Sequence, residues 1–583
     1  MTDSHTDRTA APGPADESGT VEGVASEILT TGQAWWKTAV VYQIYPRSFA
    51  DSNGDGIGDL EGIRSRLDYL AGLGVDVLWL SPIYRSPQLD NGYDISDYRD
   101  IDPVFGTLDE FDALVTEIHD RGMKLVMDLV VNHTSDEHPW FRQSRSSADN
   151  PRRNWYWWRP PRDGAEPNGF RSAFGGPAWT RDAASGEYYL HLFAPQQPDL
   201  NWENPAVRQA IYAMMRWWLD RGVDGFRMDV INLIAKRGEL IDGTGNGHAF
   251  SMGPQIHEYL QEMRREVFAG RAGDFLTVGE MPGVTFDDAA LFTDPARGEL
   301  DMVFQFDHVS LDHSAASKFD NTALELRALK KSLADWQGAL SQAGWNSLYL
   351  GNHDQPRSLS RFGNDGRYRY ESATLLATVL HLHRGTPYIY QGDEFGMTNA
   401  SFASIEDYRD IESLNHYSEA VEAGANPVDV VDALRFRSRD NARTPVQWDA
   451  SPNAGFTTGE PWIGVNPNYR TVNAASDGTA ANSIGAYYRR LIELRHTLPV
   501  VAVGDFALLE PEHPHLYAFT RTLGDDRLLI VANVGNNPLE VPLVREWGAG
   551  DILVGNYPAS RGAVLQPWEA RVYRHRPESL HRS

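Results

Sequence analysis

The chain has 583 residues, a formal net charge of −27 and no cysteine. This length predicts several domains, since a single domain usually holds about 100–200 residues. The negative charge argues against nucleic acid or an anionic membrane as partner, and the absence of cysteine excludes disulfides, thiolate zinc sites and cysteine nucleophiles.

Residues 1–34 are rich in Ala, Ser, Gly, Thr and Asp and contain no apolar run like a signal-peptide core. We expect them to form a disordered tail. No stretch of about 18 or more apolar residues occurs later, so no membrane span is expected. These features predict a cytoplasmic protein.

Beyond the tail, short apolar runs alternate with helical patterns. The candidate strands are residues 39–45, 75–81, 124–131, 225–231, 275–280, 302–306, 346–352 and 386–394. Each is followed by a helical or loop segment. Eight β-then-α units predict an α/β fold in which a parallel sheet, buried on both faces, closes into a (β/α)8 TIM barrel.

Two insertions and a change of pattern divide the chain further. Residues 134–204, after strand three, are too many for a βα loop and predict a small inserted domain, domain B. A second insertion, at about 395–475, follows strand eight. From residue 503 short alternating strands predict a C-terminal antiparallel β domain, 503–583. The barrel then comprises residues 35–133 and 205–502.

The loop DSNGDGIGD, residues 51–59, begins like an EF-hand but has Gly62 where that motif needs Glu, and no helix precedes it. Hard oxygen ligands could still bind a structural Ca²⁺ or Mg²⁺ here. The candidate ligands are the side chains of Asp51, Asn53, Asp55 and Asp59 and the carbonyl of Ile57. A metal-free Asp/Gly turn is the alternative.

Polar residues gather where the predicted barrel strands end, which is where barrels place their functional groups. They are Asp128, Asn132 and His133 after strand three, Arg227 and Asp229 on strand four, Glu280 on strand five, and Asn352, His353 and Asp354 after strand seven. A single such residue is often only a polar cap. Several convergent carboxylates with Arg and His indicate a catalytic site.

The chemistry of this cluster favours glycoside hydrolysis. The sequence has no HExxH, no G-x-S-x-G and no phosphate-binding loop motif. Paired carboxylates can instead act as a nucleophile and as an acid that later becomes a base. We expect Arg227 to lower the pKa of Asp229 and keep it ionised, and burial with neighbours such as Asp354 to raise the pKa of Glu280.

Five segments resemble, in order and spacing, the motifs of glycoside hydrolase family 13, the α-amylase family. They are DLVVNHTS (128–135), QPDLNWENP (197–205), GFRMDVI (225–231), TVGE (277–280) and GNHDQPR (351–357). The resemblance extends from about Trp35 to the C-terminus. It implies retention of the α-configuration, with the two reacting carboxyl groups about 5–5.5 Å apart.

The resemblance also implies roles for single residues. Asp229 matches the nucleophile, Glu280 the general acid/base, and Asp354 a third carboxylate that binds sugar hydroxyls and stabilises the transition state. The ligands of the sugar whose bond is cut would be Arg227, His133 and His353.

WWKTAVVYQIYPRSF (35–49), QPDLN and RDNARTPVQWD (439–449) resemble the oligo-1,6-glucosidase and α-glucosidase branch of that family. There, Asp90, Tyr93 and Arg443 match residues of a pocket closed behind the non-reducing end, which implies exo action on one terminal glucose. Oligo-1,6-glucosidases are also similar in the 51–59 loop, which implies a bound cation and no organic cofactor.

Val230, directly after the nucleophile, resembles enzymes that prefer α-1,6 bonds; TVGEMPGV (277–284) and FQFDHVSLDH (304–313) support this preference. Valine is also ordinary in a buried parallel strand. SLDHS (310–314) lacks the RLDRD segment of sucrose isomerases, so water is the expected acceptor.

We therefore expect a retaining exo-α-glucosidase acting on small isomaltooligosaccharides as a monomer or weak homodimer, with no nucleic-acid or membrane partner. An α-1,4-glucosidase or transglucosidase acting on maltose or sucrose is the main alternative. A non-catalytic transporter subunit of the same fold would need a transmembrane helix and a degraded site.

Overall fold

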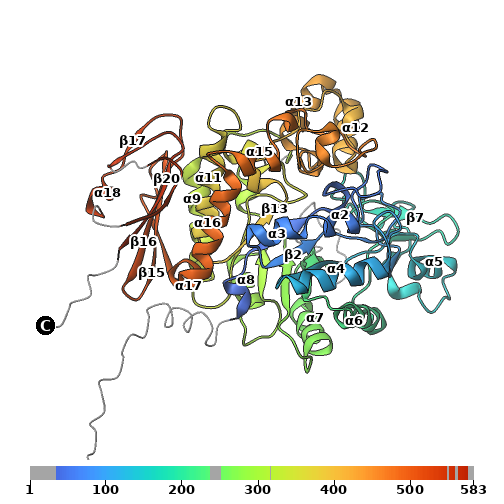
Figure 1. Ribbon diagram of the computed structural model, residues 1–583. Coiled ribbons are helices and arrows are strands. Elements are labelled where there is room, and N and C mark those ends of the chain that lie inside the picture. Colours follow the sequence, from blue (N-terminus) through green and yellow to red (C-terminus); the bar gives the residue numbers. More distant parts are fainter. Residues whose placement is uncertain (1–33, 237–250, 315–316, 548–550, 559–561, 576–583) are drawn as a thin grey trace, which may run out of the picture.

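The computed structural model describes residues 34–236, 251–314, 317–547, 551–558 and 562–575. Apart from Ala34, the predicted N-terminal tail lies outside these ranges. Figure 1 shows a barrel in the centre, a β-sheet domain at one side and two insertions on the other. No helix among the described residues is long and apolar enough to cross a membrane.

Eight parallel strands form the central sheet, in the order β11-β10-β9-β5-β2-β1-β13-β12. They are β1 (Val41–Ile44), β2 (Val77–Leu80), β5 (Lys124–Val130), β9 (Gly225–Asp229), β10 (Leu276–Glu280), β11 (Met302–Phe304), β12 (Ser347–Leu348) and β13 (Thr386–Tyr390). A parallel bridge between Val303 and Asn346 joins the end strands β11 and β12. The predicted TIM barrel is confirmed.

Alternation along each strand decides what the barrel interior contains. Val126 and Val278 belong to the cluster of apolar side chains within the barrel, while Leu125 and Met127 pack with the surrounding helices. Residues two positions beyond an interior residue face the same way. Asp128 and Glu280 therefore point toward the barrel axis at the carboxyl end of their strands.

Helices surround this sheet and pack apolar side chains against it. They are α2 (Leu60–Arg64), α3 (Leu67–Leu73), α4 (Leu108–Asp120), α6 (Pro205–Asp220), α7 (Ile256–Met263), α8 (Phe286–Thr293), α9 (Leu326–Ala339), α10 (Ser358–Phe362), α11 (Arg369–Leu382) and α16 (Ile484–Thr497). Helix α11 is buried on all sides over most of its length. Helix α4 shows how the sequence sets a boundary, because Thr107 and Glu110 form a reciprocal capping box at its start.

Domain B follows β5 and contains α5 (Pro139–Ser146) and an antiparallel sheet of β6 (Trp158–Arg159), β8 (Tyr188–Leu190) and β7 (Trp179–Arg181). Its small core is built from aromatic and aliphatic side chains such as Trp157, Phe170 and Trp179. A short hairpin, β3 (Tyr84–Arg85) and β4 (Asp97–Ile101), follows β2. These segments rise above the carboxyl ends of the strands.

The second insertion follows β13. It contains α12 (Ile411–Glu422), α13 (Pro427–Arg437), α14 (Asp440–Arg443) and α15 (Ala474–Thr479). Helix α12 begins at Asp410, whose side chain accepts a hydrogen bond from the backbone N–H of Ser413 (3.0 Å). Asn426 caps α13 in the same manner through Val428 N. The two helices project at the top of Figure 1.

The C-terminal part is an antiparallel sheet in the order β14-β15-β16-β20-β18, as predicted. Its strands are β14 (Asp505–Leu509), β15 (Leu516–Leu523), β16 (Asp526–Asn533), β18 (Asp551–Gly555) and β20 (Ala570–His575); β17 (Leu539–Glu540) pairs with β19 (Val564–Leu565). The short helices α17 (Pro499–Val503) and α18 (Leu543–Glu546) lie before and within it. Lys330 of α9 connects the barrel to this domain: its Nζ donates hydrogen bonds to the carbonyls of Glu510, His513 and Leu516.

Candidate active site

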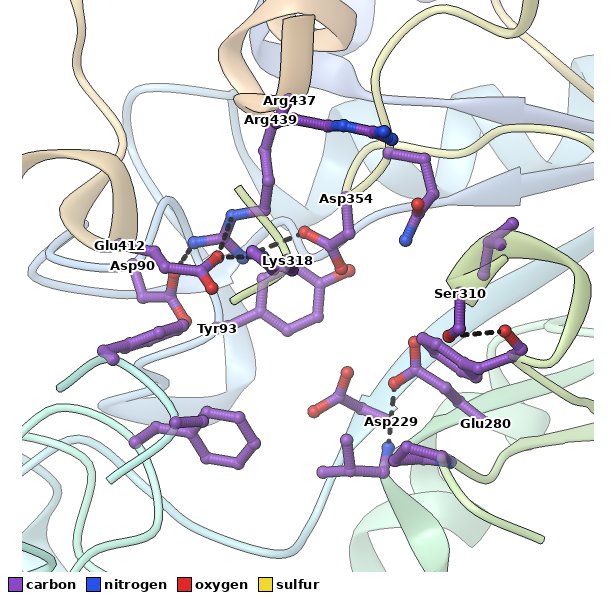
Figure 2. A pocket seen from close by; sticks show the side chains of 18 of the residues that line it. Asp90, Tyr93, Asp229, Glu280, Ser310, Lys318, Asp354, Glu412, Arg437 and Arg439 are labelled. Carbon is purple, nitrogen blue, oxygen red and sulfur yellow. Dashed lines mark hydrogen bonds and ion pairs between the residues drawn. The ribbon is translucent and has the colours of Figure 1, made fainter. Parts of the chain in front are cut away.

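A cavity of about 360 Å³ opens at the carboxyl ends of the barrel strands, below domain B and the second insertion. Its walls contain Asp90, Tyr93, His133, Asp229, Glu280 and Asp354, all predicted from the sequence (Figure 2). Three further predicted residues, Arg227, His353 and Arg443, lie behind this wall and are completely buried. The structure therefore brings all nine predicted catalytic and substrate-binding residues into one site.

Arg227 is the centre of the carboxylate cluster. Its Nη1 lies 2.8 Å from Asp128 Oδ1 and 2.7 Å from Asp229 Oδ1, and its Nη2 lies 2.6 Å from Glu280 Oε1. The second oxygen of Glu280 accepts a hydrogen bond from the backbone N–H of Val230 (3.1 Å). One guanidinium thus fixes two of the carboxylates that line the cavity, Asp229 and Glu280.

Burial raises the pKa of Glu280 to about 7, and the nearby charges of Asp229 and Asp354 add to this effect against the opposing Arg227. The raised pKa expected from the sequence is confirmed, and it suits a group that must donate a proton near neutrality.

Burial also raises the pKa of Asp229 to about 7, although Arg227 acts in the opposite direction. Arg227 does act to lower the pKa of Asp229, as expected, but the expectation that this would keep Asp229 ionised near neutral pH is wrong. The reason is that Arg227 is shared among three buried carboxylates, so its charge is insufficient for all of them. Near neutral pH the cluster therefore retains a proton, as coupled carboxylates do.

Asp354 has the opposite environment. One of its oxygens, Oδ1, accepts from Arg439 Nη1 (2.9 Å) and Arg443 Nη2 (2.8 Å), and the other lies 3.1 Å from His353 Nε2. Burial alone would raise its pKa. His353, Arg439 and Arg443 overcome that effect and hold the pKa of Asp354 well below its usual range. Asp354 is therefore the carboxylate that stays ionised.

A chain of hydrogen bonds connects the residues at the part of the cavity wall that contains Asp90, Tyr93 and His133. Tyr93 Oη lies 2.7 Å from His353 Nε2 and donates to Asp128 Oδ2 (3.0 Å), and the Tyr93 and His353 rings stack with centroids 5.2 Å apart. Gln197 Nε2 donates to Asp90 Oδ2 (3.0 Å) and lies 3.3 Å from His133 Nε2. Burial lowers the pKa of His133 to about 4, so this ring is neutral.

The profile of a family described as the alpha amylase catalytic domain matches residues 43–504. The chain belongs to the α-amylase family. It is therefore a glycoside hydrolase, and the fold and motifs described above are those of this family.

Three similar proteins carry different activities in their names. The oligo-1,6-glucosidase of Parageobacillus thermoglucosidasius is 55% identical, covering 93% of this chain and 99% of the relative. The trehalose-6-phosphate hydrolase of Bacillus subtilis is 48% identical, covering 93% and 98%. The crystal structure of isomaltulose synthase from a Klebsiella species superposes with a TM-score of 0.90 at 44% identity, covering 93% and 100%.

Two residues of this α-amylase family site were not predicted. Arg439 contacts Asp90 (3.4 Å) and Asp354 (2.9 Å), and Asp410 Oδ1 accepts from Arg439 Nε (3.0 Å). Arg439 stands four residues before Arg443 in RDNAR, so helical spacing could have suggested it. Asp410 lies in the second insertion, without a motif to mark it.

Lys236 was also missed. Its ammonium group lies 2.6 Å from Asp199 Oδ2, 2.8 Å from Asn132 Oδ1 and 2.7 Å from the Leu233 carbonyl. Asp199 belongs to domain B and Asn132 to the end of β5, next to His133. The buried lysine therefore joins domain B to the barrel beside the cavity.

The candidate metal loop lies between β1 and α2. Asp51 Oδ1 accepts from Asn53 N (2.9 Å), Asn53 Oδ1 from Asp55 N (2.9 Å), and Asp55 Oδ1 from Ile57 N (2.9 Å). These consecutive turns keep hard oxygen donors along one exposed loop. The donor types fit Ca²⁺ or Mg²⁺.

Asp59 is used differently from the prediction. It caps α2 by accepting from Gly62 N (2.6 Å) and also accepts from Ser52 N (3.0 Å). In the ranges that the structure describes, no group of three or more His, Asp or Glu residues could hold a metal ion. The expected convergence of Asp51, Asp55 and Asp59 is therefore not observed, because capping directs Asp59 toward the helix.

Proposed function

We propose that this chain is an exo-acting, retaining α-glucosidase that releases glucose from the non-reducing end of isomaltooligosaccharides by hydrolysing α-1,6 bonds. The observation that supports this proposal most directly is the pairing of Asp229 and Glu280 at one wall of a cavity whose opposite end is filled by the contacts among Asp90, Arg439 and Asp354. A cavity of this form accepts a chain end and excludes the middle of a polymer.

In the first step, an oxygen of ionised Asp229 attacks the anomeric carbon while Glu280 donates its proton to the glycosidic oxygen. The bond to the leaving sugar breaks with its electron pair on that oxygen, and a β-glucosyl ester of Asp229 forms. In the second step Glu280 takes a proton from water, whose oxygen displaces Asp229. Glucose then leaves in the α-configuration.

Arg227 supports both steps by positioning rather than by proton transfer. Its contact with Asp229 keeps one carboxylate oxygen occupied and leaves the other to attack, and its contact with Glu280 fixes the acid beside it. Asp354 is ionised before substrate arrives, so it can accept hydrogen bonds from two sugar hydroxyls at no further electrostatic cost.

The α-1,6 preference rests on Val230 and on the names of relatives such as the 55% identical oligo-1,6-glucosidase. Val230 is 8% exposed and follows the nucleophile directly, where its branched side chain narrows the approach of the leaving sugar. Initial rates on isomaltose, panose, maltose, sucrose and trehalose 6-phosphate test this preference. Equal or faster cleavage of any of the last three would overturn the α-1,6 assignment.

Stereochemistry and mechanism need separate measurements. Proton NMR of early product should show α-glucose before mutarotation; β-glucose first would exclude a retaining mechanism. Asp229→Asn keeps the shape of the nucleophile and removes its charge. Its purified protein should hydrolyse p-nitrophenyl α-glucoside at least about 1,000-fold more slowly than wild type.

The proposal includes a structural Ca²⁺ or Mg²⁺ in the 51–59 loop, held by oxygens of Asp51, Asn53 and Asp55 and the Ile57 carbonyl. Asp59 would join these ligands only if one of its carboxylate oxygens bound the cation while still accepting a hydrogen bond from Gly62 N or Ser52 N. The proposal also includes a cytoplasmic, monomeric or weakly dimeric protein, which fractionation and light scattering would test.

A further inference from the structure

Helix α12 links the chemical site to the tip of domain B. Domain B enters the chain after β5 and α12 after β13, so the two insertions are far apart in sequence. Figure 1 shows both on the side of the barrel away from the C-terminal sheet. They meet through a tight loop of domain B, residues 171–176, which we name the domain B tip.

Two side chains of α12 hold this tip. Asn415 Nδ2 donates to the carbonyl of Phe174 (2.9 Å), and Glu419 Oε1 accepts from the backbone N–H of Gly176 (2.9 Å). Arg171 lies 3.8 Å from the same Glu419 oxygen. Both hydrogen bonds use the backbone of the tip, so they fix the path of the chain.

The close approach requires glycine at position 175. Gly175 has a φ of +93°, and a Cβ there would lie 2.5 Å from Glu419 Oε1. A side chain at this point would be strained in the backbone and would displace Glu419. The tip is therefore shaped to fit against α12.

Phe174 carries the effect of this contact into the cavity. Its ring is buried and lines the cavity, with the Arg439 guanidinium 5.2 Å from its centroid. On the other side it packs against Phe193 (5.5 Å), which packs against His133 (5.0 Å). Movement of Phe174 would loosen the wall beside Arg439 and beside His133, a predicted glucose-binding residue.

The first turn of α12 is fixed to the site independently. Asp410, at the helix start, binds Arg439, and Glu412 lines the cavity and pairs with Lys318 and, at 3.5 Å, with Arg439. The helix is thus anchored to the arginine that holds Asp354 at one end, and to domain B through its middle. Figure 2 shows Glu412, Lys318 and Arg439 on the same side of the cavity.

We propose that Asn415 and Glu419 are positioning residues that hold the domain B tip against α12 and thereby set the tightness of the glucose pocket through Phe174. The inference rests on the proposed function for the identity of the sugar. When the domain B tip contacts α12, the cavity wall fits one terminal glucose. When this contact is broken, glucose and the end of the substrate chain bind more weakly, while Asp229 and Glu280 stay in place.

The test compares Asn415→Asp and Glu419→Ala with Glu422→Ala, an exposed position one turn further along the same helix. Aspartate keeps the shape of Asn415 but cannot donate to a carbonyl. We expect the KM for isomaltose and the Kd for glucose, measured by calorimetry, to rise together by about 3- to 10-fold, as loss of one hydrogen bond predicts. The kcat should change less than about 2-fold, and Glu422→Ala should resemble wild type.

A conservative variant separates positioning from general damage. Glu419→Gln retains an oxygen that can accept from Gly176 N, so it should recover most of the glucose affinity that Glu419→Ala loses. Unchanged glucose affinity in both Asn415→Asp and Glu419→Ala would overturn the inference, as would an equal loss in Glu422→Ala. Glucose binding needs no bond cleavage, so it can be measured whatever bond the enzyme cleaves. If the wild type binds glucose but does not hydrolyse isomaltose, the proposed α-1,6 activity is refuted, and the binding test of Asn415 and Glu419 still applies.

Discussion

The ammonium group of Lys236 lies 2.6 Å from the carboxylate of Asp199, and both side chains are completely buried. Burial lowers the pKa of Lys236, while Asp199 acts to raise it. The same ammonium donates to Asn132, whose amide lies 3.2 Å from His133 Nδ1. An internal cation therefore couples the attachment of domain B to the placement of a predicted sugar ligand.

Replacing Lys236 by Met should leave the Asp199 charge buried without its partner. We expect the free energy of unfolding to fall by about 3–5 kcal/mol, the usual cost of breaking a buried ion pair. Urea denaturation measures this, with the exposed Lys331→Met as control. The double variant Lys236→Met, Asp199→Asn should recover much of the lost free energy of unfolding. A loss below about 1 kcal/mol in Lys236→Met alone would contradict an energetic coupling between the two residues.

With Glu280 as the proposed acid, its raised pKa should set the alkaline limit of activity. Only protonated Glu280 can act as the acid, so kcat/KM should fall as the pH rises through about 7, the pKa that burial gives this group. Glu280→Gln should lose this limb and slow isomaltose hydrolysis by about 10²–10⁴-fold. On p-nitrophenyl α-glucoside, whose leaving group needs no proton, the Glu280→Gln variant should lose less of its rate. If kcat/KM of this variant still falls above about pH 7 as in wild type, Glu280 is not the acid.

Removing the charge of Arg443 should weaken substrate binding at acidic pH. His353, Arg439 and Arg443 together hold the pKa of Asp354 low against its burial, so Arg443→Met lets that pKa rise. Protonated Asp354 binds sugar hydroxyls poorly, and KM should begin to increase at a higher pH than in wild type. The free energy of unfolding should also begin to fall at a higher pH than in wild type. Ionised Asp354 stabilises the folded state, and this contribution is lost as the pH falls through its folded-state pKa. The exposed Arg490→Met is the control, and coincident pH profiles would contradict the prediction.

Val230 combines a branched side chain with a left-handed backbone, φ +34° and ψ 44°. Such a conformation is strained for valine and is often retained at functional sites. Val230→Ala should widen the approach of the leaving sugar and raise the rate ratio of maltose to isomaltose by about 10-fold. Val309→Ala makes the same truncation elsewhere in the cavity wall and should leave the ratio near wild type. Equal ratios in both variants would remove Val230 as the determinant.

Chelation tests the 51–59 loop. If the loop binds a cation, EDTA should lower the Tm by about 2–3 °C, since binding to the native state stabilises a chain of this size by a few kcal/mol. Activity at mild temperature should hardly change, because the loop lies outside the cavity wall. Asp51→Ala should lower the Tm and abolish the EDTA effect, whereas the exposed Asp68→Ala should keep it. An EDTA-insensitive wild type would indicate a metal-free turn.

The barrel strands could be predicted because parallel strands buried on both faces are continuous apolar runs. Strand β12 was expected over 346–352 but covers only Ser347–Leu348, since the following residues leave the sheet to place His353 and Asp354. The capping role of Asp59 was not predicted, because a metal ligand and a helix cap have the same sequence appearance. Asp410 and Lys236 could not be found, since their charged partners, Arg439 and Asp199, lie at least 29 residues away along the chain.

By itself the sequence determined which residues are candidates for catalysis and in which order they occur along the chain. The spacing of Arg227 and Asp229 places both on one face of a strand, and the strand order brings Glu280 and Asp354 to the same end of the barrel. Only the tertiary structure decided the protonation states of these residues and the shape of the cavity around them. Asp229 and Asp354 are the same amino acid, yet burial among carboxylates raises the pKa of one, and two arginines with a histidine lower that of the other. Charge, burial and the closure of the pocket depend on neighbours that folding alone brings together.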